Sequence, residues 1–432
     1  MSFPLLLLLI FLRVPIGLSM FVVGLGGLYF VTGGMNVALA KLKSETYSTF
    51  SSYSLSIVPM FLLMGQFATL GGMSQALFKA AESWLGHRRG GVAMSAVGAC
   101  AGFGAICGSS LATAATMGQV ALPELRRYGY SGGFSTATLA AGGTLGILIP
   151  PSVVLVIYAI LTEQNIAKLF LAAFIPGILA ALGYIATISV YVRLNPDSAG
   201  VRPPVPYSER FAALFRVWPV LLVFLTVVLG IYLGWFTPTE GAAVGALGTG
   251  LIALANGGLT RKSFADSILA TGRSTAMIFF IVLGAGFYNG FLALTQVPQE
   301  LASWVGAQGY SPWFVLALIL ALYLVFGCFM DSLSMILLTI PIFFPIVSVL
   351  DFGLSPEETA IWFGILVLIV VEVGLITPPV GMNLFVINSM DRQTPMVETY
   401  KAVMYFVASD IFRVILLVLF PGITLFLLRV LH

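Results

Sequence analysis

Two short polar segments interrupt long apolar runs and carry oxygen atoms that suit a small cation. Gly108-Ser109-Ser110 supplies neutral hydroxyls, and Met330-Asp331-Ser332 supplies a carboxylate. An ionisable group at bilayer depth is costly and is a functional residue by default. Serine is a weaker signal, because small residues also let membrane helices pack closely. The two segments therefore indicate a site that suits a bare cation such as sodium.

Each polar segment is followed by a long apolar run that a double proline breaks. The breaks are Pro150-Pro151 and Pro378-Pro379. Proline has no N–H and clashes with the preceding turn, so each double proline ends one half-helix and begins another. Each polar segment is expected to do the same. Irregular backbone inside a bilayer must be satisfied by protein or by a water-filled cavity. Four half-helix amino termini are thus predicted near the midplane, where their positive ends suit a carboxylate.

The two halves of the chain repeat one pattern. Both contain an apolar segment, a polar break, a second apolar segment with a proline, and a long apolar run broken at a double proline. Paired interruptions in corresponding places are the best sequence pointer to a transport site. The aligned pairs are Gly17 with Gly241, Gly24 with Gly248, Ser110 with Ser332, Leu111 with Leu333, Pro123 with Pro345, and Gly146 with Gly374.

The composition is that of a polytopic helical membrane protein. Of the 432 residues, 59% are hydrophobic and 9% are charged, which excludes an ordinary soluble domain. The apolar runs barely alternate, unlike the strands of a membrane barrel. The net charge of +3 is too small to suggest nucleic acid as a partner. No G-x-x-x-x-G-K-[ST] segment is present, so we expect no ATP hydrolysis.

The positions of the basic residues predict that each polar segment is the tip of a re-entrant hairpin. Arg88-Arg89 and Arg126-Arg127 flank an apolar segment of about 36 residues, which as one helix would be roughly 54 Å long, whereas a bilayer core is only ~30 Å thick. A hairpin keeps both arginine pairs on one face, as the positive-inside rule prefers. The corresponding second hairpin lacks lysine and arginine at its ends and is expected to open to the outside.

These observations predict an all-α polytopic membrane protein with two inverted-topology repeats, each containing a re-entrant helical hairpin and an interrupted transmembrane helix. One apolar span is expected from about Leu5 to Val31. The predicted domains are 1–193 for the first repeat, with a hairpin at about 90–127 and an interrupted helix at about 134–162; 194–236 for a cytoplasmic linker and an extra transmembrane helix; and 237–432 for the second repeat, with a hairpin at about 313–350 and an interrupted helix at about 359–389.

Other residues leave alternatives open. Glu372 lies inside an apolar run and is either a helix contact or a proton site, and the role of Arg13 is open. Ser152 and Asn383, which follow the double prolines, are candidate substrate ligands, although Asn383 would also serve as a helix-start hydrogen bond. We expect no enzyme: Gly108-Ser109-Ser110-Leu111 has some likeness to intramembrane serine proteases, but the histidine base they need is missing from the apolar segments.

Six segments, in their joint order and spacing, give the chain a resemblance to a known family. It resembles the large membrane subunit of a tripartite ATP-independent periplasmic (TRAP) transporter over essentially its whole length. The segments are Arg13-Val14-Pro15-Ile16-Gly17, Val58-Pro59-Met60-Phe61, Gly108-Ser109-Ser110, Gly146-Ile147-Leu148-Ile149-Pro150-Pro151-Ser152, Pro238-Thr239-Glu240-Gly241 and Thr377-Pro378-Pro379-Val380-Gly381.

The resemblance implies a sodium-driven elevator importer in the bacterial inner membrane. It implies that Na⁺ is the coupling ion, that no organic cofactor is used, and that a periplasmic binding protein delivers a small organic acid such as sialic acid or a C4-dicarboxylate. It also implies a small four-helix membrane subunit, expected as a separate chain. The implied sodium ligands are Ser109, Ser110, Gly146, Pro150, Asp331, Ser332, Gly374 and Thr377.

Two other functions stay open at this point. A stand-alone dicarboxylate symporter of the related divalent-anion family shares the hairpin plan, but that family carries Ser-Asn-Thr at the tips, where this chain has Gly-Ser-Ser and Met-Asp-Ser. A passive anion channel would not need a coupling ion. An imposed sodium gradient separates the carriers from the channel, because only a coupled carrier accumulates its substrate.

Overall fold

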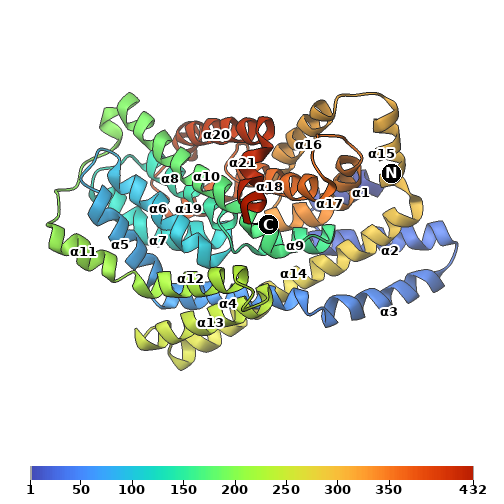
Figure 1. Cartoon of the computed structure of the whole chain (residues 1–432), viewed down its shortest axis with the longest axis horizontal. Helices are drawn as coiled ribbons and strands as arrows, with labels where there is room; N and C mark the ends of the chain where they lie inside the picture. The colour runs from blue at the N-terminus through green and yellow to red at the C-terminus, as the bar shows by residue number, and fades with distance from the viewer. Residues whose placement is uncertain (1, 432) are drawn as a thin grey trace.

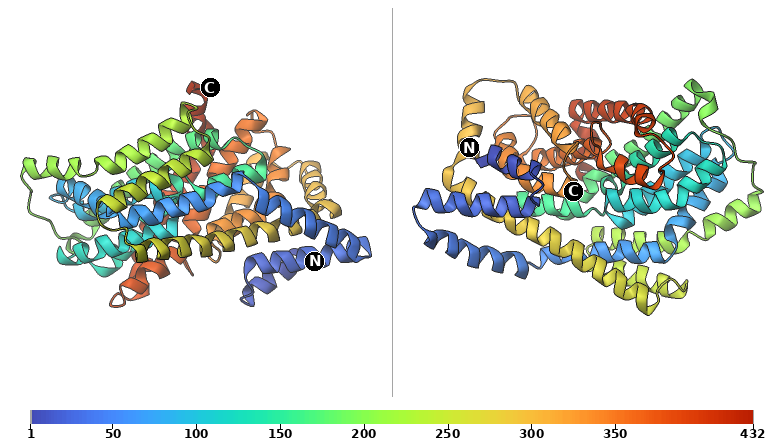
Figure 2. Two further views of the ribbon diagram at one scale, coloured as in Figure 1. Left: turned by 90° about the horizontal axis from the view of Figure 1, so that it is seen from below. Right: turned by 180° about the vertical axis from the view of Figure 1, so that it is seen from behind.

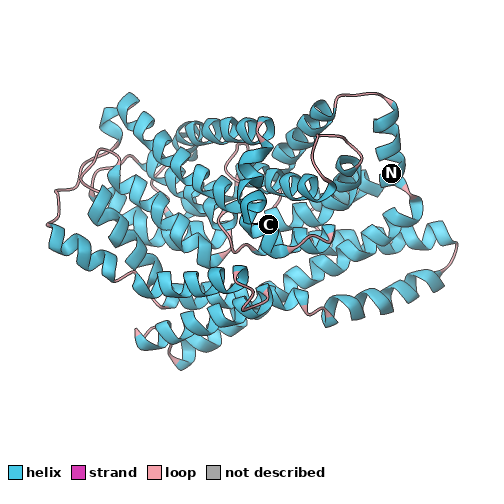
Figure 3. Cartoon of the chain, viewed as in Figure 1, coloured by secondary structure: helices cyan, strands magenta, loops and turns pink. Residues whose placement is uncertain are grey.

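The computed structural model describes residues 2–431, and this part of the chain consists of helices and loops without a strand (Figure 3). Three single helices are long and apolar enough to cross a membrane, and three bent helix pairs are so when each is taken as one span. The predicted all-α, polytopic membrane fold is therefore confirmed. The single helices are α10 (Ile166–Leu194), α14 (Arg261–Thr295) and α20 (Met396–Leu419).

Four helices form one layer, which we call the frame. They pair as α2 with α14 and α4 with α13, and α4 also contacts α14. These pairs are symmetric, because α2 and α13 begin the two repeats and α4 and α14 follow them. Figure 1 shows α4, α13 and α14 along the lower side of the molecule. The frame helices are α2 (Ile16–Thr32), α4 (Ile57–Leu70), α13 (Pro238–Ala255) and α14.

Glycine brings α2 against α14. A Cβ on Gly24 would lie 2.6 Å from the backbone nitrogen of Tyr288, so only glycine allows this approach. Gly248, which aligns with Gly24 in the second repeat, has a different neighbour. A Cβ there would meet Val223 of α12 (Trp218–Tyr232), which is not a frame helix. The repeated glycines thus serve helix packing in both halves, but against different neighbours.

The two hairpins and the two interrupted helices form a second group, which we call the hairpin unit. Each hairpin packs on the interrupted helix of its own repeat, as α6 does on α8 and α16 on α18. Across the repeats, α7 contacts α19 and α17 contacts α9. The helices are α6 (Gly91–Cys107), α7 (Ser110–Arg127), α8 (Gly132–Leu148), α9 (Val153–Thr162), α16 (Pro312–Gly327), α17 (Ser332–Ser348), α18 (Pro356–Gly374) and α19 (Met382–Met390).

The remaining helices connect and cover these two groups. α5 leads from α4 to the first hairpin, and α15 leads from α14 to the second. α1 and α11 lie toward opposite ends of the long axis (Figures 1 and 2). The bounds are α1 (Ser2–Phe11), α3 (Met35–Ser51), η1 (Ser54–Ser56), α5 (Met73–Leu85), η2 (Pro196–Ser198), α11 (Tyr207–Phe215), α15 (Val297–Ala307) and α21 (Pro421–Leu431).

The single span expected from Leu5 to Val31 is wrong. The structure divides it into α1 and α2, and Arg13 between them has a left-handed backbone with φ 66°. Pro15 is the N-cap of α2, and proline disfavours helical backbone at the residue before it, so an apolar run that is continuous in composition still breaks here. The domain limits themselves stay a prediction, and Met1 and His432 lie outside the described residues.

The predicted inverted arrangement should leave the open ends of the two hairpins reachable from opposite faces of the membrane. In a background without native cysteines, we expect single cysteines replacing Arg89 and Tyr128 to react only from the cytoplasm. Cysteines replacing Tyr310 and Asp351 should react only from the periplasm. The measurement is labelling by a membrane-impermeant thiol reagent in oriented vesicles. Reaction of Arg89→Cys and Tyr128→Cys from opposite faces would mean a full crossing and would contradict the inverted repeat.

Candidate transport site

The tip of the first hairpin is a sharp turn closed by a serine cap. Gly108 ends α6 with φ 63°, a left-handed conformation that glycine adopts without strain. Ser109 follows in extended backbone as the N-cap of α7, and its Oγ accepts a hydrogen bond from the Ala112 N–H at 3.4 Å. The turn therefore presents the amino terminus of α7, with its partial positive charge, at the tip.

The tip of the second hairpin is capped by a carboxylate. Asp331 is the N-cap of α17, and its Oδ2 accepts a hydrogen bond from the Ser334 N–H at 3.1 Å. Its Oδ1 accepts another from the Ser334 hydroxyl at 2.5 Å. An ionised carboxylate has about four lone-pair positions, so these two bonds leave capacity for a cation. Asp331 thus combines a capping role with a formal charge at the tip.

Both tips line one cavity of about 310 Å³ between the hairpin unit and the frame. Three half-helix amino termini border it, those of α7, α9 and α17. The fourth, that of α19, does not line it, so the expectation of four converging termini is only partly met. The lining residues from the hairpin unit are Gly108, Ser109, Ser110, Leu111, Ala112, Ile147, Val153, Val154, Asp331, Ser332, Leu333 and Leu375.

The frame closes the other side of this cavity. Leu62 and Gln66 reach it from α4, and Ser274, Met277 and Ile278 reach it from α14. The cavity wall therefore combines hydroxyl, amide and carboxylate groups with a larger apolar surface. A few polar groups set in an apolar wall are typical of a small-molecule site.

Glu372 joins the two hairpin tips. This residue of α18 is 1% exposed, and its Oε2 accepts a hydrogen bond from the Ser110 hydroxyl, the first residue of α7. Its Oε1 accepts another, of 2.6 Å, from the Ser332 hydroxyl, the first residue of α17. One buried carboxylate thus holds the amino termini of two helices that belong to different repeats. The alternatives left open for Glu372, a helix contact or a proton site, now have a geometry: each carboxylate oxygen accepts a hydrogen bond from a serine of one hairpin tip.

The predicted glycine positions hold the tips against the interrupted helices. A Cβ on Gly146 would lie 2.8 Å from the Ser109 carbonyl oxygen and would also clash with the Thr113 hydroxyl. In the second repeat, a Cβ on Gly374 would lie 2.5 Å from the Gly327 backbone. Both glycines therefore allow backbone contact next to a tip. Thr113 is buried there, and its hydroxyl has no hydrogen-bond partner among the described residues.

Four of the eight predicted sodium ligands lie outside the lining of the cavity: Gly146, Pro150, Gly374 and Thr377. Pro150 lines a small crevice together with Phe170 and residues of α12. The peptide bonds Pro150-Pro151 and Pro378-Pro379 are both cis. The Thr377 hydroxyl donates to the Val373 carbonyl at 2.6 Å. Their role as sodium ligands stays a prediction.

The two candidate substrate ligands are also used locally. The Ser152 hydroxyl caps α9 by accepting from the Leu155 N–H at 3.4 Å. The Asn383 Nδ2 donates to the Ala140 carbonyl at 3.2 Å, while its buried Oδ1 has no partner among the described residues. Substrate binding by Ser152 and Asn383 stays a prediction.

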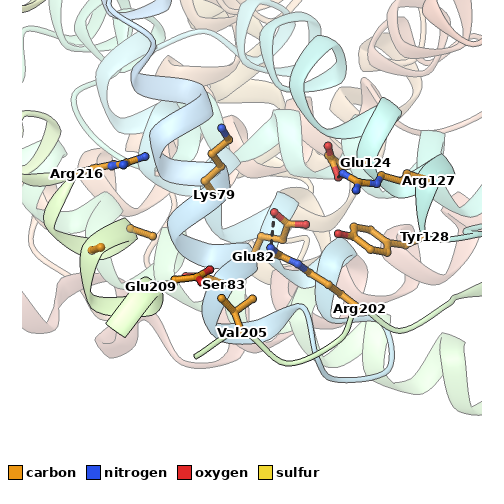
Figure 4. Close-up of a pocket in the computed structure, with 12 residues that line it drawn as sticks. Lys79, Glu82, Ser83, Glu124, Arg127, Tyr128, Arg202, Val205, Glu209 and Arg216 are labelled. Atoms are coloured by element: carbon orange, nitrogen blue, oxygen red, sulfur yellow. Dashed lines mark ion pairs between the residues drawn. The ribbon is translucent and has the colours of Figure 1, made fainter. Parts of the chain in front are cut away.

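A second cavity, of about 430 Å³, lies at the end of the first hairpin, between α5, α7 and α11 (Figure 4). Acidic and basic side chains alternate on its wall, and the buried Glu82 pairs there with Arg202 at 3.1 Å. This pair ties α5 to the segment before α11, and burial raises the pKa of Glu82. Because neither sign of charge dominates, the wall selects no class of ligand, and its clearest role is structural.

Sequence reasoning missed three residues of the site. Gln66 is a polar residue inside an apolar run, which is the signal that could have selected it, whereas Ser274 stands between Arg273 and Thr275 and gives no such signal. Thr113 carries no comparable signal, because threonine in a membrane helix commonly bonds to its own backbone. The pairing of Glu372 with two serines in different hairpins required the three-dimensional structure.

Comparison with solved structures concerns the fold. The fold matches the crystal structure of the Alcanivorax borkumensis YdaH transporter with a TM-score of 0.65, 13% identity and 90% coverage of both chains. At that identity the likeness concerns the fold alone.

Sequence comparison then gives the family. Residues 3–423 match the model of the tripartite ATP-independent periplasmic transporter, DctM component. The chain is 37% identical to the C4-dicarboxylate TRAP transporter large permease protein DctM of Pseudomonas aeruginosa, over 90% of this chain and 89% of the relative. It is 30% identical to the ectoine TRAP transporter large permease protein TeaC of Halomonas elongata, over 97% and 96%. The chain belongs to the large permease subunits of TRAP transporters, as its sequence motifs indicated.

Proposed function

We propose that this subunit imports a small organic acid by coupling its movement to sodium. The observation that carries the proposal is the cavity in which both hairpin tips meet: it offers helix amino termini for a carboxylate and oxygen atoms for a bare cation. Sodium is here a transported ion and not a resident cofactor. The Thr113 hydroxyl, which has no hydrogen-bond partner in the described part of the chain, and the Ser109 carbonyl both lie beside Gly146 and would fit such an ion, because their oxygen atoms have lone pairs to offer.

The division into frame and hairpin unit supports an elevator mechanism. The cavity lies at the boundary between these two groups, so sliding of the hairpin unit along the frame would carry the tips and their ligands together. The helices α5 and α15 connect the groups and would act as the arms of that motion. Alternating access by movement of one repeat group against another is common among transporters with inverted repeats.

Relatives narrow the substrate class and the partners. Three relatives are named for C4-dicarboxylates, sialic acid and ectoine. Each of these compounds bears a carboxylate group, and we assign a carboxylate-bearing substrate to this chain as well. The family description implies a periplasmic component, and we propose that a binding protein delivers the substrate. A separate small membrane subunit and a location in the bacterial inner membrane complete the proposal.

Uptake should depend strictly on a loaded binding protein. The experiment uses proteoliposomes that contain this chain and its small subunit, with sodium outside and radiolabelled substrate added either free or bound to the binding protein. We expect almost no uptake of free substrate and clear uptake of delivered substrate, because the outward loops are short and poor in charge and offer little to capture dilute substrate unaided. Equal uptake in both cases would instead favour a stand-alone symporter.

A further inference from the structure

Glu372 is placed to make the two hairpin tips act as one unit. It accepts hydrogen bonds from Ser110 and from Ser332, which belong to different hairpins in different repeats. Each serine is the first residue of its helix and follows the capping residue of its tip, Ser109 or Asp331. The carboxylate is therefore the shared acceptor behind both candidate ion sites.

The direction of these hydrogen bonds matters for cation binding. A serine hydroxyl has one proton and two lone pairs. Because each hydroxyl donates its hydrogen bond to Glu372, the lone pairs of Ser110 and Ser332 must face away from that carboxylate. Both serines line the cavity. The hydroxyls are thereby held in the orientation that a cation needs. A displacement of either helix would change the position of the carboxylate and hence the orientation of the other hydroxyl.

We infer that Glu372 is a positioning residue that couples sodium binding at the two hairpin tips, so that occupation of one tip favours occupation of the other. The inference rests on the proposed sodium coupling and adds a mechanism for cooperativity between the ions. Glu372 acts in it through the two serines and not as an ion ligand. The protein surrounds this carboxylate completely, which fits a positioning role better than direct contact with a hydrated ion.

The test measures sodium binding to the purified complex of this chain with its small subunit. The readouts are the rise of the melting temperature with sodium concentration and the uptake of ²²Na. We expect cooperative binding in the unaltered protein and a Hill coefficient that falls to about 1 in Glu372→Gln, because independent sites show no cooperativity. Glutamine keeps the size of the side chain but donates hydrogen bonds with its amide nitrogen, so it cannot accept from both serines with equivalent oxygens. Glu357→Gln, an exposed change on the same helix, is the matched control and should leave the coefficient unchanged.

A double-substitution cycle keeps the inference testable if Glu372→Gln fails to fold. Ser110→Ala and Ser332→Ala should change sodium affinity non-additively, because they share one acceptor. Additive effects, or an unchanged Hill coefficient in folded Glu372→Gln, would overturn the inference while leaving sodium coupling intact. A merely structural role would lower the melting temperature without changing the coefficient. Absence of any sodium effect on the unaltered complex would overturn both this inference and the proposed function.

Discussion

Replacing Asp331 with asparagine should abolish most sodium-driven uptake while leaving the fold intact. Asparagine is as good an N-cap as aspartate, so the bond from the Ser334 N–H to the side chain at position 331 is retained. What is lost is the formal charge at the only tip that carries one. A cation without its water shell gains more from a carboxylate than from a neutral oxygen, so the apparent sodium affinity should fall by about tenfold or more.

The measurement is uptake against sodium concentration, together with a melting curve with and without sodium. Asp351→Asn is the matched control, because it removes an acidic group at the open end of the same hairpin, where the side chain only accepts from the Gly353 N–H. The melting temperature without sodium should be nearly unchanged in both variants. Asp331→Asn with unaltered sodium dependence would show that Asp331 is not a sodium ligand and that hydroxyls and carbonyls alone form the sites.

Replacing Gly104 with alanine should destabilise the packing of the first hairpin on its interrupted helix. Gly104 of α6 packs directly on Gly146 of α8, and an added Cβ would lie 2.5 Å from the Gly146 Cα. Backbone atoms cannot rotate away as a flexible side chain can, so the hairpin must separate from the interrupted helix. Overpacking of this kind costs about 1–3 kcal/mol. Because Gly146 also contacts the Ser109 carbonyl, uptake should fall as well.

Gly98 on the same helix provides the control for this prediction. A Cβ at Gly98 would meet no atom within 4 Å, so Gly98→Ala should be neutral or slightly stabilising, since alanine favours a helix over glycine. The readouts are the melting temperature and binding-protein-dependent uptake of both variants. Equal melting temperatures would show that α6 and α8 are free to separate, and the close contact would then not hold the tip in place.

The local breaks of the fold could be predicted from the sequence because their causes are local. Proline at Pro150-Pro151 and Pro378-Pro379 removes hydrogen-bond donors wherever it lies, and a glycine-serine turn can end a helix in any context. The second hairpin and its interrupted helix repeat the same signals. The first span was misjudged because its apolar composition continues across Arg13 and Pro15, where backbone geometry, not hydropathy, ends the helix.

Contacts between residues that are distant in the sequence could not be predicted in this way. Ser110 and Glu372 are 262 positions apart, and nothing in either segment specifies the other. The same holds for Gln66, which becomes part of the cavity only because the frame lies against the hairpin unit. Sequence reasoning therefore placed the tips of the hairpins and left the side chains that join them to be found in the structure.

The most direct test of sodium-coupled import is accumulation of substrate against its own gradient. Proteoliposomes with this chain, its small subunit and loaded binding protein are given an inward sodium gradient, and the internal substrate concentration is measured against vesicles with equal sodium on both sides. Sodium-coupled import predicts internal substrate well above the external concentration only when the gradient is present. Substrate that merely equilibrates at the same level in both sets of vesicles would contradict it and would identify a passive pathway.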